Sequence, residues 1–191
     1  MNATSPSRGT PRLFSRMSRF RFHVVALLAL WGGEVIAQQQ FGDFTYKLNE
    51  DRVTIIDYAE SAKGSIVIPA TINEKPVTSI GNNAFAYCTG LASLTIPKNV
   101  TSIGQSAFAR CTELTSVTIG NSVTSIGEWA FLDCTKLTSV YFEGNAPKTG
   151  AGRFSGVDTK KLKLHIYEGS TGFESDPWDI HPRISMKRPA Q

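Results

Sequence analysis

One pattern of 23 residues recurs three times in this chain. Residues 78–100 read TSIGNNAFAYCTGLASLTIPKNV, residues 101–123 read TSIGQSAFARCTELTSVTIGNSV, and residues 124–146 read TSIGEWAFLDCTKLTSVYFEGNA. Ten of the 23 columns are identical in all three copies. A fixed period of this length is typical of solenoids, in which each repeat forms one coil and packs on a copy of itself. The repeat therefore predicts a stack of coils with a shared apolar core.

The apolar columns predict one strand in each coil. The spacing L-x-x-L-x-L at 91–96 recurs at 114–119 and 137–142, with Val, Ile or Phe in place of some leucines. Its last two apolar positions alternate, as they do along a strand with one buried face. Degenerate copies at 65–68 and 164–167 bring the number of expected strands to five. Stacked in order, these strands would pair as one parallel sheet, with Leu94, Val117 and Val140 in a single interior row.

A second set of columns predicts the return path of each coil. An apolar pair is followed by a glycine, where we expect a corner that leaves no room for a side chain. An Ala-Phe pair then supplies one small and one large apolar group, which we expect on a short helical turn. These columns contain the glycines Gly81, Gly104 and Gly127 and the pairs Ala84-Phe85, Ala107-Phe108 and Ala130-Phe131.

The segments outside the clean repeats predict caps, because terminal coils need a different outer surface to stay soluble. FTYKL (44–48) and VTIIDY (53–58) flank a polar turn and predict a β-hairpin over the first coil. Residues 168–184 predict an irregular lid over the last coil. The expected organisation is a signal peptide at 1–37, an N-terminal cap with a degenerate first repeat at 38–76 and three repeats at 77–146. A degenerate last repeat with the C-terminal cap follows at 147–184, and a loose tail at 185–191.

The first 37 residues are typical of a secretory signal peptide. A start rich in Arg and Ser leads into the apolar run VVALLALW (24–31), and Val35-Ile36-Ala37 precedes a polar stretch. The alternative is a membrane anchor, but the run is shorter than the roughly 20 residues of a spanning helix. We expect cleavage after Ala37, and the sequence leaves open whether translation starts at Met1 or Met17. The rest of the chain then holds 15 basic and 15 acidic residues, which argues against a nucleic-acid partner.

Residue types that carry chemistry are present, but their spacing favours structural roles. Cys88, Cys111 and Cys134 are 23 residues apart, which matches no zinc or redox motif; we expect buried free thiols. His165 is expected to be a solvated side chain on the outer face of the last strand. Asp176 and Asp179 flank Trp178, and we expect the indole to close the core and the acids to be solvated. No catalytic, metal or cofactor site is predicted.

Polar positions between the buried strand residues form the candidate ligand face. Hydroxyl groups repeat there, which either reflects the preference of exposed strands for Ser and Thr or provides a flat hydrogen-bonding surface. Binding to ice is a weaker alternative, since the array is irregular. A second hydroxyl column follows the sequence Thr-Ser at 78–79, 101–102 and 124–125. The residues of the candidate face are Ser93, Thr95, Ser116, Thr118, Ser139 and Tyr141.

The motif TSIG…AFxxCTxLTSVTIP, present at 78–97, 101–119 and 124–142, resembles the BspA-type leucine-rich repeats of bacterial surface and secreted proteins. SIVIPATINEKPV (65–77) is similar to the first repeat of that family, and VYFEGNAP (140–147) and LHIYEGSTGF (164–173) are similar to its C-terminal ending. The resemblance implies a right-handed leucine-rich-repeat coil with a parallel sheet on one face and short helical or irregular segments on the other.

The same resemblance implies a non-catalytic exported protein, located outside the cell, at its surface or in the periplasm, that binds a macromolecule. The expected partner is a protein or a glycan, held through the strand face. We expect a monomer that does not stay inserted in a membrane after signal cleavage. The alternative is a structural envelope or matrix component without a specific ligand.

Overall fold

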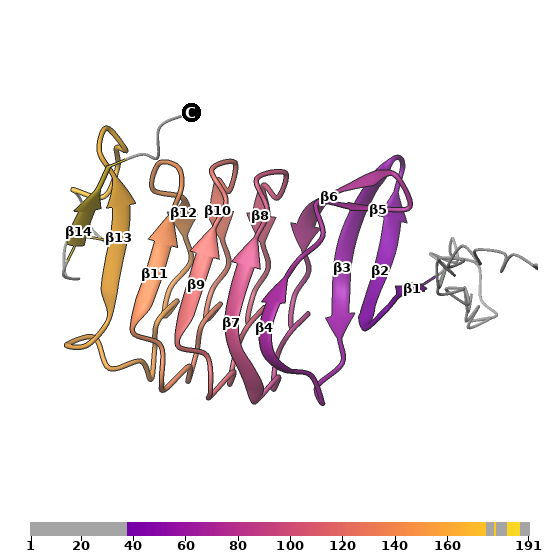
Figure 1. Cartoon of the computed structure of the whole chain (residues 1–191), viewed down its shortest axis with the longest axis horizontal. Coiled ribbons are helices and arrows are strands. Elements are labelled where there is room, and N and C mark those ends of the chain that lie inside the picture. Colours follow the sequence, from indigo (N-terminus) through magenta and orange to yellow (C-terminus); the bar gives the residue numbers. More distant parts are fainter. Residues whose placement is uncertain (1–37, 175–177, 179–182, 188–191) are drawn as a thin grey trace, which may run out of the picture.

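The computed structural model describes residues 38–174, 178 and 183–187, and its described part contains strands and turns but no helix. The strands lie side by side along the long axis of the molecule, with the N-terminal hairpin at one end and the last strands at the other (Figure 1). The described strands are β1 (Gln39–Phe41), β2 (Phe44–Asn49), β3 (Arg52–Tyr58), β4 (Lys63–Val67), β5 (Thr71–Ile72), β6 (Lys75–Ile80), β7 (Gly90–Ile96), β8 (Ser102–Ile103), β9 (Ser116–Ile119), β10 (Ser125–Ile126), β11 (Ser139–Phe142), β12 (Lys148–Thr149), β13 (Lys163–Tyr167) and β14 (Arg183–Met186).

The main sheet contains one strand from each coil, as the repeat predicts. Its order is β14-β13-β11-β9-β7-β4, and every neighbouring pair is parallel. Leu94 pairs with Val117, and Val117 pairs with Val140. All three side chains are buried. The predicted interior row, and with it the stacking of one coil on the next, is confirmed.

A second sheet runs behind the main sheet, where we predicted helical or irregular segments. Its order is β1-β2-β3-β6-β8-β10-β12, and from β3 to β12 all pairs are parallel. The short strands β8 and β10 contain the Ser-Ile of the second and third TSIG motifs, and β6 ends in that of the first. Ile80, Ile103 and Ile126 are buried in the core. The isoleucine before each glycine is therefore part of a strand, and β8 and β10 are too short to show a clear alternation in sequence.

The third side of each coil is a wall of turns, which we call the turn wall: residues 82–87, 105–110, 128–133 and 151–156. The prediction of a short helical turn for the Ala-Phe pairs is wrong. The Phe85 amide donates to Ala107 O at 2.8 Å, and the Phe108 amide donates to Ala130 O at 2.8 Å. A helix would use these amides within one segment, whereas here they join one coil to the next.

A column of stacked aromatic rings fills the core behind the turn wall. Phe85 and Phe108 have ring centroids 5.2 Å apart, and Phe108 and Phe131 have centroids 5.3 Å apart. Phe154 extends the column at 5.6 Å from Phe131, although the sequence around it, GRFSG, shares only the phenylalanine with the repeat. Trp178 closes the column and is 2% exposed, which confirms its predicted place at the end of the core.

The repeated glycines stand where successive coils come closest. A Cβ added at Gly104 would lie 2.6 Å from the backbone nitrogen of Asn82, and one added at Gly127 would lie 2.5 Å from that of Gln105. Backbone atoms cannot move aside as a flexible side chain can, so these corners exclude every residue with a Cβ. The expected corner without room for a side chain is confirmed.

Both ends of the coil are covered, although the C-terminal end differs from the expectation. Strands β2 and β3 form the predicted hairpin, and β3 continues the second sheet by pairing with β6. Ser185 and Met186, expected in a loose tail, instead belong to β14, which adds a sixth strand beside β13. The predicted signal peptide at 1–37 lies outside the described residues, as do Asp176 and Asp179. No described helix could span a membrane.

Candidate ligand face

The six residues of the candidate face lie where the sequence predicts, on the outer side of the main sheet. Along β9 and β11, half-buried and buried side chains alternate, and the central part of β7 continues the pattern. Ser116, for example, is half-buried, whereas Val117 is inside the core. The alternation follows from the pleat of a strand, in which successive side chains point to opposite faces.

The strand pairing arranges the outer residues in two rows across the sheet. We call the first the serine row, in which Ser65, Ser93, Ser116, Ser139 and Lys163 are paired from strand to strand. We call the second the threonine row, in which Val67, Thr95, Thr118, Tyr141, His165 and Ile184 are paired in the same way.

Five residues of these rows were missing from the predicted face, and one of them is Ser65 on the degenerate strand β4. Val67, His165 and Lys163 occupy outer positions of the degenerate strands, so the same alternation would have assigned them to the face. Ile184 could not be found in this way, because β14 has no counterpart in the repeat. Val67 is 68% exposed and Ile184 is 37% exposed, so the threonine row ends in an apolar side chain at both edges of the sheet.

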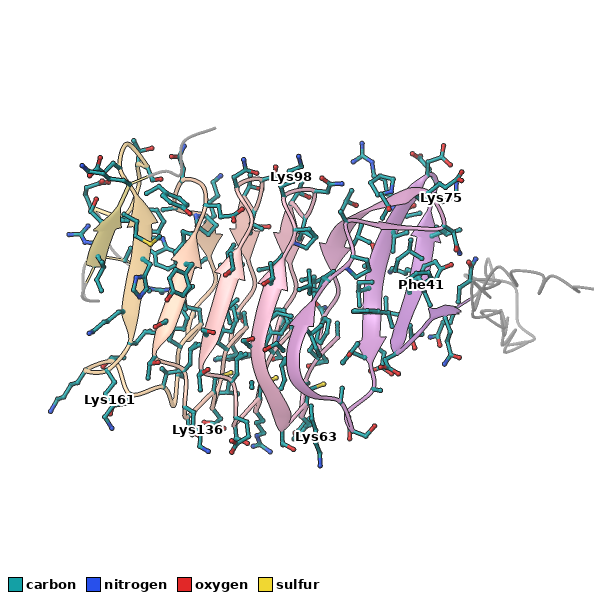
Figure 2. All side chains as sticks on the ribbon, in the orientation of Figure 1. Phe41, Lys63, Lys75, Lys98, Lys136 and Lys161 are labelled. Atoms are coloured by element: carbon teal, nitrogen blue, oxygen red, sulfur yellow. The ribbon has the colours of Figure 1, made fainter. Side chains whose placement is uncertain are left out.

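The hydroxyl groups of the face are largely available to a ligand. Ser93 Oγ donates to Ser65 Oγ at 2.7 Å. Among the described residues, the side-chain hydroxyls of Thr95, Ser116 and Thr118 have no hydrogen-bonding partner. Groups of this kind can donate and accept hydrogen bonds. The labelled lysines lie along the rims of the sheet, Lys98 at one rim and Lys136 at the other (Figure 2).

The hydroxyl column on the second sheet is organised differently. Thr101 Oγ1 donates to Thr78 O at 3.2 Å, and Thr124 Oγ1 donates to Thr101 O at the same distance. Ser102 Oγ donates to Ser79 Oγ at 3.0 Å. These hydroxyls join adjacent coils, so their repetition has a structural explanation that Thr95, Ser116 and Thr118 of the main sheet lack.

An aromatic pair lies toward the C-terminal end of the threonine row. The rings of Tyr141 and His165 are stacked with centroids 4.2 Å apart. His165 Nε2 is buried and has no hydrogen-bonding partner among the described residues. Burial lowers the pKa of His165, and the positive charge of Lys163 lowers it further. The expectation of a solvated histidine on the last strand is therefore wrong on both points, since β14 also follows β13.

The three cysteines are buried and free, as expected. Cys111 Sγ and Cys134 Sγ each lie 3.1 Å from a backbone oxygen of the preceding coil, Phe85 O and Phe108 O respectively. Burial is the main reason why the pKa of Cys88 is raised to about 12. A protonated thiol is neither a nucleophile nor a metal ligand. Within residues 38–174, 178 and 183–187, no group of His, Cys, Asp and Glu could hold a metal ion.

The stacked parallel strands, the L-x-x-L-x-L spacing and the interior row define a leucine-rich-repeat solenoid. The family model for the BspA type leucine rich repeat region matches residues 58–174 in six copies. The chain therefore belongs to the BspA-type leucine-rich repeat family. No curated protein matches the chain in sequence.

Solved structures of bacterial leucine-rich repeat proteins are similar to this chain. One from Bacteroides capillosus is 30% identical with a TM-score of 0.58, over 68% of this chain and 97% of that chain. A leucine rich cell surface protein from Faecalibacterium prausnitzii is 30% identical with a TM-score of 0.55, over 70% of this chain and 38% of that chain. The T. pallidum leucine rich repeat protein is 24% identical with a TM-score of 0.54, over 64% of this chain and 68% of that chain, and supports the fold alone.

Proposed function

We propose that this is an exported, non-catalytic protein that recognises a protein or a glycan through the outer face of its main sheet. The observation that carries the proposal is the contrast between the two hydroxyl arrays. On the second sheet the hydroxyls of Thr101, Ser102 and Thr124 bond to the neighbouring coil. On the main sheet those of Thr95, Ser116 and Thr118 have no partner among the described residues. A row of free hydroxyls beside a phenol and an imidazole can hydrogen-bond and stack with a partner.

Export is supported by the predicted signal peptide and by similarity to a protein described as a leucine rich cell surface protein. Solenoids of this kind present one continuous surface, because each coil adds the same outer positions. The threonine row spans six strands, and strands in a sheet are about 4.8 Å apart. A row of that length suits a macromolecule better than a small molecule, which binds in a concave pocket.

The competing function is a structural component whose repeats serve only stacking. The hydrogen bond from Ser93 to Ser65 favours that alternative, because it uses two hydroxyls of the face to join adjacent coils. The two functions differ in whether the outer residues affect binding. A recognition protein needs them, whereas a stacking protein does not.

A triple variant tests the proposal. Ser116→Arg, Thr118→Arg and Tyr141→Arg together place three charges and long side chains on the face. The matched control is Thr89→Arg, Thr112→Arg and Thr135→Arg, which makes the same change in charge. These three residues lie in the turns just before the main-sheet strands β7, β9 and β11. Wild type and both variants are immobilised and screened against glycans and bacterial surface proteins.

We expect the face variant to lose at least one ligand found in the screen, by about tenfold or more in affinity, because buried contacts carry most of a binding energy. The control should keep that ligand. A face variant that keeps every ligand of the wild type would show that the strand face is not the site. Absence of any ligand in both screens would favour the structural function.

A further inference from the structure

Trp129 is a large aromatic side chain that the core does not use. It is 41% exposed on the outside of the turn wall. The aromatic column behind the wall is complete without it, since Phe131 of the same coil contacts both Phe108 and Phe154. Burial therefore does not explain why a tryptophan occupies this position.

The backbone at Trp129 has a conformation that a bulky residue rarely adopts. Its φ is +52°, in the left-handed region. The equivalent residues of the other coils are, in chain order, Asn83, Ser106 and Gly152, and each also has a positive φ. Asn and Gly tolerate this conformation, whereas a bulky side chain there is strained. Strained residues that persist in a folded chain are concentrated at functional sites.

The next coil supports the indole from one side. A Cβ added at Gly152 would lie 2.5 Å from Trp129 Cδ1 and 2.7 Å from Trp129 Nε1. Glycine at this position therefore lets the five-membered part of the indole rest on the backbone of the next coil. The indole N–H donates to no described residue. One side of the ring is held in place, and the rest is open to solvent.

Polar groups lie in the adjacent column of the same wall. Tyr87, Arg110 and Asp133 occupy equivalent positions in successive coils, each with a left-handed φ. The Arg110 guanidinium lies 5.3 Å from the centre of the Tyr87 ring, and Arg110 Nε lies 3.6 Å from Asp133 Oδ2. A Cβ at Gly156 would collide with Asp133 Oδ1, so glycine again makes room for the side chain of the preceding coil.

Trp129 and Asp133 belong to one tight turn. The Leu132 amide donates to Trp129 O at 3.0 Å, which folds the chain back between the two residues. Trp129 and Asp133 each donate a backbone N–H to the next coil, at 3.0 and 2.8 Å. Both residues therefore lie on a backbone that is fixed by hydrogen bonds, and both are accessible, with Trp129 41% exposed and the Asp133 side chain 43% exposed.

The charges on this wall balance one another. The wall holds two basic residues, Arg110 and the buried Arg153, and two acidic residues, Asp133 and the exposed Glu128 beside Trp129. Arg110 Nε is paired with Asp133 Oδ2 at 3.6 Å. A surface without net charge neither attracts nor repels an ion at long range. The exposed aromatic side chains of the wall are Trp129 and Tyr87, and two partly exposed rings fall far below the roughly 800 Å² per partner of a stable protein interface.

We propose that Trp129, with Asp133 and Arg110, forms a second binding site on the turn wall, and that its ligand is a neutral glycan. The flat indole face can stack on the C–H face of a pyranose ring. The carboxylate accepts and the guanidinium donates hydrogen bonds, and together they match the neighbouring hydroxyls of a sugar. The site is separate from the strand face, because the turn wall is the third side of each coil.

Titration with neutral hexasaccharides tests the proposal. The probes are cellohexaose, chitohexaose, mannohexaose and maltohexaose, added to the full chain and followed by calorimetry and by the indole N–H signals in NMR spectra. The chain has three tryptophans, and Trp129→Asn identifies the signal of Trp129 by its loss. That substitution installs the residue of the equivalent position 83, so the fold should be kept.

We expect saturable binding of at least one hexasaccharide and a shift of the Trp129 indole signal alone. Trp129→Asn should weaken that binding about tenfold or more, as loss of an aromatic anchor does. Asp133→Asn should weaken it by a smaller factor. Lys98→Ala, at an exposed residue on the rim of the sheet outside both proposed sites, is the control and should leave it within about twofold.

Three results would overturn the proposal. The first is the lack of saturable binding to all four probes up to about 10 mM, a concentration beyond the weakest affinities that specific recognition uses. The second is binding that Trp129→Asn does not change, and the third is self-association in sedimentation that Trp129→Asn abolishes. None of them bears on the strand face, whose own ligand and variants are tested separately.

Discussion

His165 stacks on Tyr141 with ring centroids 4.2 Å apart and ring planes 18° apart. The two residues are paired across β11 and β13, so the stack joins one coil to the next on the outer face of the main sheet. His165 Nε2 is buried by this arrangement and has no partner among the described residues. A proton added to the imidazole would therefore be poorly solvated.

The first prediction concerns the pH dependence of stability. The pKa of His165 is lower in the folded chain than the usual value of about 6.5 in the unfolded chain. Between those two pKa values the unfolded chain binds more protons, so the free energy of unfolding rises with pH. The contribution is fully present above about pH 6.5 and is lost as the pH falls through the folded pKa.

Denaturant unfolding between about pH 5 and pH 8 measures this effect. His165→Phe keeps an aromatic ring on Tyr141 but cannot titrate. As the pH falls from about 8 to about 5, the free energy of unfolding of this variant should therefore decrease less than that of the wild type. Parallel pH profiles for the two proteins would contradict the prediction.

The second prediction concerns the aromatic column. Phe108 is fully buried between Phe85 and Phe131. Phe108→Ala should lower the free energy of unfolding by about 3–5 kcal/mol, since it leaves a cavity in the middle of the stack. Tyr87→Asn is the matched control, because it removes an exposed ring from the same wall. It should cost no more than about 1 kcal/mol, the value of an exposed cation–π contact. Equal losses in urea unfolding would disprove the role of the column.

The third prediction concerns the close approach of adjacent coils. The φ of Gly127 is outside the left-handed region. Position 127 therefore requires glycine because a Cβ there would collide with the backbone of Gln105. Gly127→Ala should destabilise the chain by about 1–3 kcal/mol, because the backbone around Gln105 must shift. Gly42→Asn, at a left-handed turn with nothing within 4 Å, should stay within about 0.5 kcal/mol. Thermal unfolding measures both, and tolerance of alanine at residue 127 would contradict the argument.

The fourth prediction concerns the cysteines. At pH 8 the buried Cys88 thiol, with a pKa raised to about 12, is almost entirely protonated in the folded chain. The folded protein should therefore react very slowly with the disulfide reagent DTNB, which needs a thiolate. In about 6 M guanidinium chloride, where the chain is unfolded, all three cysteines should react quickly. Rapid labelling of the folded protein at any of them would show that this part of the core opens.

The main sheet could be predicted from the sequence, because the same column of each repeat supplies one residue of the interior row. Leu94, Val117 and Val140 occupy equivalent columns, and stacking equivalent columns leaves one possible register. The hairpin was predictable for a similar reason, since its two strands are adjacent in the chain and a polar turn separates them. The six residues of the candidate face follow from the same alternation, although their role in binding stays a proposal.

The misassigned features depend on contacts that no short segment contains. The local sequence of the Ala-Phe segments is compatible with a helical turn or with a non-helical one. The structure has non-helical turns, in which the Phe85 amide donates to Ala107 O of the next coil. Residues 183–186 have no match to the repeat, yet β14 forms because β13 presents an open edge. Phe154 could not be assigned to the aromatic column from the sequence, because its neighbours differ from those of Phe131. Only the structure shows that the two rings are stacked.

The sequence by itself determined that the chain winds into coils of 23 residues and which side chains face the core. That information is local, because the direction of a side chain follows from its position in the strand. Only the tertiary structure decided which outer groups meet, as in the stack of Tyr141 on His165 and the indole of Trp129 resting on Gly152. These contacts join residues at least 23 positions apart, and their geometry depends on how closely one coil lies on the next.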